Sequence, residues 1–362
     1  MSSPSEYEPE DDQTSSEPLL EKTETTASVL SLRKRYVSAV IAAIVVLIVV
    51  LFLLILWPLR SKAFQSSNGD GVCRQAQAAA RREWRLLSSP ERLEYLRAVK
   101  CLSSIPSTIC NGTLHDEFAY IHRQIGDYSH EAAPFLPWHR YFIHIYEQTL
   151  KQRCQYQGTL PYWDWTRDWA NLTQAPVWSA TEGFGGNGDT NLPAPVGDGY
   201  CVQDGPFAGL QVQYYDGDWN PHCLSRGFLA GEYLDHFGAQ RLNSSAMAAV
   251  LDEPDYYRFL LMLEDSSHSA IPILVRGDFS RFTAPNDPIF FLHHAQVDRL
   301  WWKWQSEDLE VRALAYNGPS RQNSSIAAQL SDQVEMAGLA PDIPVSSVIT
   351  INHGLLCYKY ED

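Results

Sequence analysis

Residues 130–140, with the sequence HEAAPFLPWHR, mark the junction between two predicted helices. Proline lacks a backbone N–H and disfavours helix in the residue before it, so Pro134 and Pro137 end any helix that reaches this point. The spacing therefore predicts a new helix that begins at His139 and runs to about residue 151.

Three histidines surround this junction on different kinds of backbone. His122 closes the preceding helix, His130 lies in the loop, and His139 opens the next helix. Imidazole nitrogen is a good ligand for copper and other transition metals. Because side chains from a helix end, a loop and a helix start can converge on one ion, the pattern predicts a metal site here.

A second histidine cluster lies in residues 287–298, with the sequence DPIFFLHHAQVD. His294 and Asp298 are four residues apart and share a helix face, so we expect Asp298 to hold a neighbouring side chain in place through Arg140. His293 is turned by about 100° at 3.6 residues per turn. We therefore expect His293 to support the site or face the substrate rather than bind the same ion.

Together the two clusters resemble the copper A and copper B signatures of the tyrosinase or polyphenol oxidase family. The terminal tyrosines at 358 and 360 resemble the motif that closes the catalytic domain of that family, and the resemblance covers about residues 73–362. The positions that carry the two signatures are His130, Phe135, His139, Arg140 and Glu147 in the first, and Asp287, His294 and Asp298 in the second.

The resemblance implies a mainly α fold, a helical bundle with a type 3 copper core and long loops. It also implies two copper ions. Carried over position by position, the resemblance assigns His122, His130 and His139 to copper A, with His115 as the alternative to His122. It assigns His268 and His294 to copper B.

The same resemblance implies an enzyme that uses dioxygen to hydroxylate phenols or to oxidise catechols to o-quinones. The chain looks like short, membrane-anchored ascomycete members, which suggests a role in secondary-metabolite biosynthesis. The expected substrate is a phenolic small molecule or a tyrosine-containing peptide. Ser269, where efficient monophenol hydroxylases often have asparagine, leaves the choice between monophenol and catechol chemistry open.

One departure from the family pattern affects copper B. The family has a histidine four residues after the first copper B ligand, but here that residue is Pro272. Three readings follow: copper B keeps two histidines and gains another group, copper B is lost, or the domain is a non-catalytic binding or scaffold protein. His222, His236 and His293 are candidate substitutes for the missing ligand, and the sequence does not place any of them near His268.

The rest of residues 73–362 reads as one copper domain with helices at about 74–100, 113–124, 136–153, 254–270 and 289–306. Residues 181–199 are rich in Gly, Asn, Asp and Pro, which is typical of a loop. Residues 310–339 are mixed and polar. Loops of this length usually cap or shape a site.

The N-terminal part of the chain has a different composition. Residues 1–35 contain many acidic, Ser and Thr residues and are expected to form a disordered cytoplasmic tail. Residues 36–59 include 21 consecutive uncharged residues, enough to cross a bilayer as one signal-anchor helix, and residues 60–72 form a stem. The net charge of −15 and the lack of a basic stripe argue against nucleic-acid binding.

Glycosylation sequons and cysteines predict which side of the membrane the domain occupies. All seven cysteines follow the apolar segment, as expected for a disulfide-permissive lumenal or extracellular compartment. Seven is odd, so at least one thiol is free or intermolecular. Four N-glycosylation sequons also follow the segment, at Asn111, Asn171, Asn243 and Asn323.

Overall fold

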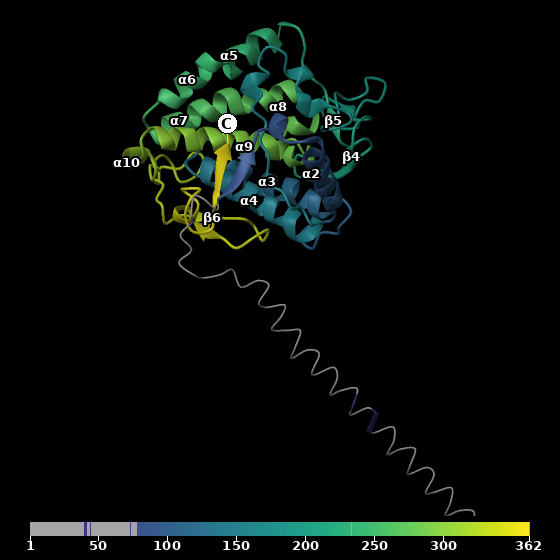
Figure 1. The fold of residues 1–362 in the computed structure, drawn as a ribbon, viewed down its shortest axis with the longest axis horizontal. Helices are drawn as coiled ribbons and strands as arrows, with labels where there is room; N and C mark the ends of the chain where they lie inside the picture. Colours follow the sequence, from purple (N-terminus) through teal and green to yellow (C-terminus); the bar gives the residue numbers. More distant parts are fainter. Residues whose placement is uncertain (1–39, 42–43, 45–72, 74–77, 233, 362) are drawn as a thin grey trace, which may run out of the picture. The chain divides into compact units, whose positions relative to one another are not determined.

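Two helices that are buried on almost every side form the centre of the fold: α4 (Phe135–Cys154) and α9 (Phe290–Glu307). They pack against each other (Figure 1). The computed structural model describes residues 40–41, 44, 73, 78–232 and 234–361, and residues 70–362 form one compact unit. Residues 135–143 and 290–301 are buried without interruption. Because both helices are buried over most of their surface, the core of the domain lies between α4 and α9.

Shorter helices surround this pair. A capping box at Thr113 and Asp116 starts α3, and a capping box at Ser88 and Glu91 starts α2. Helices α5 to α8 follow one another on the other side of α9 in Figure 1. The bounds of all these shorter helices are α2 Ser89–Leu102, α3 Leu114–Ser129, α5 Ala239–Leu242, α6 Ser244–Asp252, α7 Tyr256–Met262, the π-helix η7 Leu263–His268, α8 Ser269–Val275 and α10 Leu309–Arg312.

The strands form small two-stranded sheets. The parallel pair joins β1 (Ala79–Arg82) to β8 (Tyr358–Glu361), with Ala79 opposite Tyr358. This pair therefore brings the beginning and the end of the domain together. The other pairs are antiparallel: β2 (Tyr200–Cys201) with β5 (Ser225–Arg226), β3 (Gln211–Tyr215) with β4 (Asp218–Cys223), and β6 (Gln333–Val334) with β7 (Ile343–Pro344).

Three disulfides tie these elements together. They join Cys73 to Cys357, Cys101 to Cys154, and Cys201 to Cys223. The first fixes the start of the domain beside β8, and the second links α2 to α4. Cys110 is the free cysteine, which agrees with the odd count in the sequence.

Most of the predicted helices are confirmed, and two predictions are wrong. Residues 79–82 form a strand and not the start of a helix, because they pair with β8. The helix predicted at 136–153 is confirmed as α4, which begins at Phe135, so the prediction that it opens only at His139 is wrong. Pro137 lies in the first turn of α4, where the backbone N–H has no helical partner, so proline costs little there. Helices α5 and α6 were not predicted, whereas the loop over residues 181–199 is confirmed.

The predicted tail at 1–35 and the stem at 60–72 lie outside the described residues. So does the predicted membrane helix at 36–59, except for residues 40, 41 and 44. Among the residues that are described, no helix combines the length and the apolar character needed to cross a bilayer.

Candidate metal centre

The first histidine group consists of His122, His130 and His139. His122 lies on α3, His130 caps the C-terminus of that helix, and His139 lies in the second turn of α4. One ring nitrogen of each lies within 4.8 Å of the others. The ring centroids are 5.4, 5.4 and 5.2 Å apart. The structure thus brings together the three residues expected at copper A.

Backbone carbonyls orient all three rings of this group. Each Nδ1 lies within hydrogen-bond distance of a carbonyl: His122 of Phe282 at 2.5 Å, His139 of Phe135 at 2.8 Å, and His130 of Gly126 at 3.1 Å. A carbonyl oxygen only accepts, so each Nδ1 carries the proton and each Nε2 keeps its lone pair. These bonds therefore prepare the Nε2 atoms for a metal ion.

The second group consists of His268, His293 and His294. His268 ends the π-helix η7, and the other two are the fourth and fifth residues of α9. One ring nitrogen of each lies within 4.8 Å of the others, and all three pairs of ring centroids are 5.1 Å apart. His268 and His294 were expected together. His293 was expected to face away from them, and the structure places it beside both.

The two groups are neighbours. The rings of His139 and His294 are stacked with their centroids 4.1 Å apart, and Phe290 packs against His122 and His294. A cavity of about 420 Å³ opens beside both groups and is lined by Phe279, Phe282 and Phe290 and by every histidine of the two groups except His139. This volume lies within the range of small-molecule sites. The arrangement offers two clusters of imidazole donors beneath a single, largely aromatic cavity.

Burial keeps the rings neutral. It lowers the pKa of His122 and of His293 to about 3, with the neighbouring His130 adding to the effect on His122. Burial and neighbouring imidazoles also hold the pKa of His139, His268 and His294 well below the usual range. A neutral imidazole has a free electron pair, so these five rings are ready to bind a metal ion at neutral pH.

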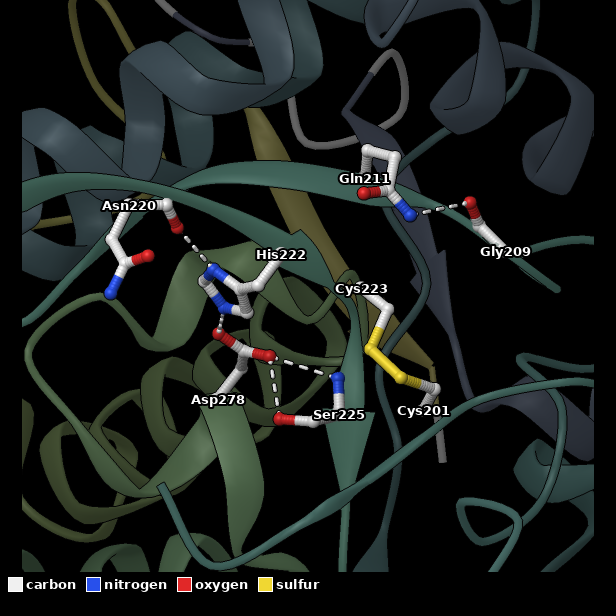
Figure 2. Close-up of a disulfide and its surroundings, with 8 residues drawn as sticks. All are labelled: Cys201, Gly209, Gln211, Asn220, His222, Cys223, Ser225 and Asp278. Atoms are coloured by element: carbon white, nitrogen blue, oxygen red, sulfur yellow. Dashed lines mark hydrogen bonds and ion pairs between the residues drawn. A yellow bond between two sulfur atoms is a disulfide. The ribbon is translucent and has the colours of Figure 1, made fainter. Parts of the chain in front are cut away.

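The remaining candidate histidines lie elsewhere. Nε2 of His115 lies 2.9 Å from the carbonyl of Asn286. Figure 2 shows His222 between the Asn220 carbonyl and Asp278, at 2.6 and 2.8 Å. Neither belongs to the two groups, so His115 and His222 do not supply the missing ligand. The side chain of His236 lies outside what the structure describes.

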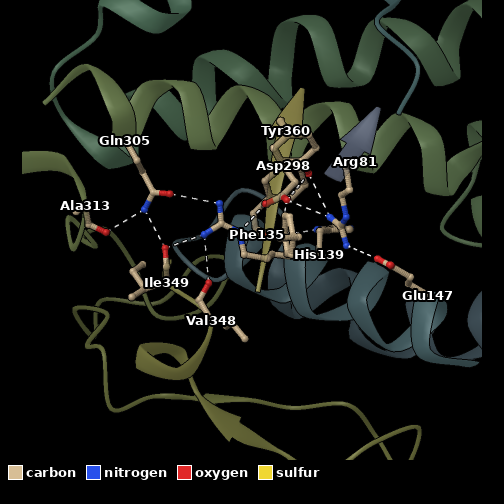
Figure 3. Close-up of polar contacts among 12 residues, drawn as sticks. Arg81, Phe135, His139, Glu147, Asp298, Gln305, Ala313, Val348, Ile349 and Tyr360 are labelled. Atoms are coloured by element: carbon tan, nitrogen blue, oxygen red, sulfur yellow. Dashed lines mark hydrogen bonds and ion pairs between the residues drawn. The ribbon is translucent and has the colours of Figure 1, made fainter. Parts of the chain in front are cut away.

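Asp298 stands behind the two groups and joins the elements that carry them. Nε of Arg140 donates to Oδ1 of Asp298 at 2.5 Å, as the spacing of the sequence suggested. Figure 3 shows Asp298 beside Arg81 and Tyr360. Oδ2 accepts from Arg81 at 3.4 Å and from the hydroxyls of Tyr358 and Tyr360. The carboxylate therefore links α4, α9, β1 and β8.

Arg140 continues this network away from the metal groups. Its guanidinium donates to the carbonyls of Val348 and Ile349 at 3.2 and 2.7 Å and lies 3.5 Å from the centre of the Trp301 ring. Since Arg140 directly follows His139, these contacts fix the backbone that carries one imidazole of the first group.

Two supporting residues were missed by the sequence reasoning. Arg81 lies on β1, a segment predicted to be helical, and it also pairs with Glu147 at 2.9 Å. Both carboxylate oxygens of Glu264 accept the backbone N–H of Glu131, at 3.1 and 3.0 Å, and burial raises the pKa of Glu264. This carboxyl holds the residue after His130. No spacing signal marks either residue, because their partners are distant in sequence.

The geometry of the donors fits copper. A metal–nitrogen bond of about 2.0 Å puts an imidazole centre roughly 3.1 Å from the ion, so three rings at 120° have centres about 5.4 Å apart. The observed separations are 5.2 to 5.4 Å in the first group and 5.1 Å in the second. Nε2 atoms of His122 and His139 are 3.2 Å apart, as expected for two ligands of one ion. Six imidazole nitrogen donors in two clusters suit two copper ions.

Comparison with known proteins places the chain in a family. Residues 113–307 match the common central domain of tyrosinase. The chain is 44% identical over 283 residues to the tyrosinase ustQ of Aspergillus flavus, covering 78% of this chain and 79% of the relative. It is 29% identical to the N-acetyl-6-hydroxytryptophan oxidase ivoB of Emericella nidulans, covering 80% of this chain and 94% of the relative.

A solved structure supports the same assignment. A polyphenol oxidase variant from Thermothelomyces thermophila superposes with a TM-score of 0.72 at 28% sequence identity, covering 84% of this chain and 93% of the other. A tyrosinase from Burkholderia thailandensis shares the fold at a TM-score of 0.54 and 17% identity, covering 79% of this chain and 74% of the other. The chain therefore belongs to the tyrosinase family of type 3 copper proteins.

Proposed function

We propose that this protein is a copper-dependent oxidoreductase that uses dioxygen to oxidise a phenolic substrate. The observation that carries the proposal is the pair of histidine groups, each with three mutually close ring nitrogens, beside one cavity of about 420 Å³. Membership in the tyrosinase family supports the same chemistry. Copper bound there would pass electrons from the phenol to dioxygen.

The reaction balances in two forms. Two catechols each give up two electrons and two protons to one dioxygen, which leaves as two waters, and two o-quinones result. In hydroxylation, one oxygen atom of dioxygen enters the ring ortho to the hydroxyl. The other oxygen atom leaves as water, with two electrons and two protons from a catechol that becomes an o-quinone. Both forms need the phenol oxygen close to both histidine groups.

The side chains of the cavity position such a ring. Phe279, Phe282 and Phe290 give it an aromatic wall, and aromatic pairs gain from edge-to-face contact beyond simple burial. Asp216 and Arg281 also line the cavity and provide its charged part. The cavity thus combines aromatic and charged side chains in its lining, as a substituted phenol requires.

We assign the substrate to phenols of fungal secondary metabolism, either a small molecule or a tyrosine within a peptide. The similarity to a relative named for oxidising N-acetyl-6-hydroxytryptophan supports an aromatic amino-acid derivative. The choice between monophenol and catechol is left to the substrate panel described below.

We also propose that the domain lies on the lumenal or extracellular side of a membrane, anchored by the apolar segment at 36–59. The three disulfides support an oxidising compartment. Asn111, Asn171 and Asn323 are exposed, and Asn243 is half-buried, where its side chain caps α6. Glycosidase treatment of the protein from its native host tests this placement, and an unchanged mass would contradict it.

The test of the function uses the purified full-length chain loaded with Cu(I). We expect about two coppers per chain and oxygen consumption with at least one member of a panel of catechols, monophenols and tyrosine peptides. His139→Ala should abolish the uptake, and His144→Gln, which changes a histidine of α4 outside both groups, should retain it. One copper per chain with no oxygen uptake would instead favour a binding or scaffold protein.

A further inference from the structure

Pro272 leaves the second histidine group one ligand short of the family pattern. It lies inside α8, four residues after His268, and lines the cavity shared by the two groups. Its side chain has no donor atom. With His268 and His294 alone, the second site would hold a metal ion by two imidazoles, whereas the first site has three.

The ring of His293 completes the second group in the same geometry as the first. Its centroid lies 5.1 Å from that of His268 and 5.1 Å from that of His294, which are themselves 5.1 Å apart. The second group is therefore an equilateral triangle of rings. The first group forms a triangle with sides of 5.2 to 5.4 Å.

No hydrogen bond within the described part of the chain accounts for the burial of the His293 ring. The residue is fully buried, and neither of its ring nitrogens has a hydrogen-bond partner among the described residues. Buried polar atoms are nearly always paired, so such a ring calls for an explanation. By contrast, the rings of the buried His115 and His222, outside both groups, each have a polar partner within 2.9 Å.

We propose that His293 is the third ligand of the second copper site, in place of the histidine that Pro272 has replaced. The identity of the metal rests on the proposed function, whereas the choice of ligand rests on this geometry. The second site then takes two adjacent ligands from the N-terminal part of α9 and one ligand from η7.

The backbone around His268 explains why the ligand has moved. In a regular α-helix, residue 272 would donate its N–H to the carbonyl of His268, and the two side chains would share a face. Pro272 has no N–H, and the turn before it is a π-helix that ends at His268. The ligand pair of the usual i, i+4 spacing is absent because residue 272 is proline, and His293 approaches His268 from a different helix.

A copper-loaded crystal structure of the wild-type chain tests the assignment directly. We expect anomalous density for a copper ion about 2.0 Å from one ring nitrogen each of His268, His293 and His294. A second ion with the His293 nitrogen beyond bonding distance, or joined to the ion only through a water, would overturn the proposal. So would a chain that binds copper at the first group alone.

A variant series gives an independent measure through Cu(I) competition with a chromophoric chelator. His293→Ala should hold one copper firmly and bind the second at least about tenfold more weakly, or not at all. His144→Gln, a matched histidine outside both groups, should bind two coppers like the wild type. His293→Ala with two coppers of unchanged affinity would overturn the assignment. If that variant does not fold, the crystal structure of the wild type decides.

These measurements separate the ligand assignment from the proposed function. Copper held by His293 in a protein that oxidises no phenol would leave the assignment standing and remove the function. Phenol oxidation by a His293→Ala variant that keeps both coppers would remove the ligand assignment and leave the proposed function standing.

Discussion

Asp298 balances the charge of two buried arginines behind the metal groups. Its carboxylate is 3% exposed, and the side chains of Arg81 and Arg140 are fully buried. Burial alone would raise the pKa of Asp298, but the charges of Arg140 and Arg81 and the hydrogen bonds from Tyr358 and Tyr360 together lower it more, so the net pKa is below the usual value. The carboxylate is therefore charged throughout the physiological range, and both arginines depend on it.

Replacing Asp298 by asparagine keeps its shape and removes its charge. Removing the charge of one partner in a buried ion pair leaves the other charge uncompensated, which typically lowers the free energy of unfolding by about 3–5 kcal/mol. We expect Asp298→Asn to lower the free energy of unfolding in urea by an amount in this range. The control is Glu335→Gln, since Glu335 pairs with Arg321 on the surface, where such pairs contribute at most about 1 kcal/mol. Equal effects of both variants would contradict this account.

Residue type and spacing predicted five of the metal-group histidines but not the place of His293. A rotation of 100° separates the Cα–Cβ directions of neighbouring helical residues, yet an imidazole extends far enough from the backbone to turn back. Arg81 and Glu264 could not be predicted, because their partners Asp298 and Glu131 are more than 100 residues away along the chain. Local pattern shows which side chains can bind a metal, and only tertiary structure shows what holds them.

At the scale of elements, a buried ion pair joins strand β4 to the short helix η8 (Gly277–Ser280). Nε2 of His222 donates to Asp278, whose other oxygen accepts from the backbone N–H and the hydroxyl of Ser225 (Figure 2). Burial lowers the pKa of His222, but Asp278 raises it more, so the net pKa lies above the usual value. The Cys201–Cys223 disulfide lies beside this contact (Figure 2).

The raised pKa of His222 predicts how this contact responds to pH. The stabilisation is fully present below the unfolded pKa of about 6.5 and is lost as pH rises through the folded pKa. We expect the difference in Tm between the wild type and His222→Gln to be largest near pH 6 and to shrink toward pH 9. The exposed His353→Gln should show no such trend. A difference that grows with pH would show that the pair is not charged as described.

The elements that the sequence predicted well are those whose caps and periodicity are local. α3, α4 and α9 appear within a few residues of the expected bounds. β1 was taken for helix because its partner β8 lies more than 270 residues later. The helix at 254–270 is in fact α7 followed by a π-helix, a change of hydrogen bonding that propensity does not encode.

At the scale of the whole molecule, copper should act as a ligand that stabilises the folded state. The six histidines come from α3, α4, η7 and α9, and the unfolded chain does not hold them together. A ligand that binds only the folded state stabilises that state by about 2.7 kcal/mol when the free ligand concentration is about 100 times its Kd. We expect removal of copper by a chelator to lower the Tm, measured by calorimetry.

The control for this prediction is the double variant His139→Ala, His294→Ala, which removes one ligand from each group. Chelator should change its Tm far less than that of the wild type. Identical melting of the copper-loaded and chelated wild-type protein would show that the two groups do not hold metal ions tightly.

The pairing of β1 with β8 has a consequence for biosynthesis. Arg81 finds its tyrosine neighbours and Cys73 its sulfur partner only in residues 357–360, which leave the ribosome after all the helices have been made. Until then, Arg81 lacks Tyr358 and Tyr360, and β1 lacks its partner strand β8. The domain is thus expected to complete its fold only once residues 357–360 have been made, and, in the proposed oxidising compartment, to form the Cys73–Cys357 disulfide at that stage.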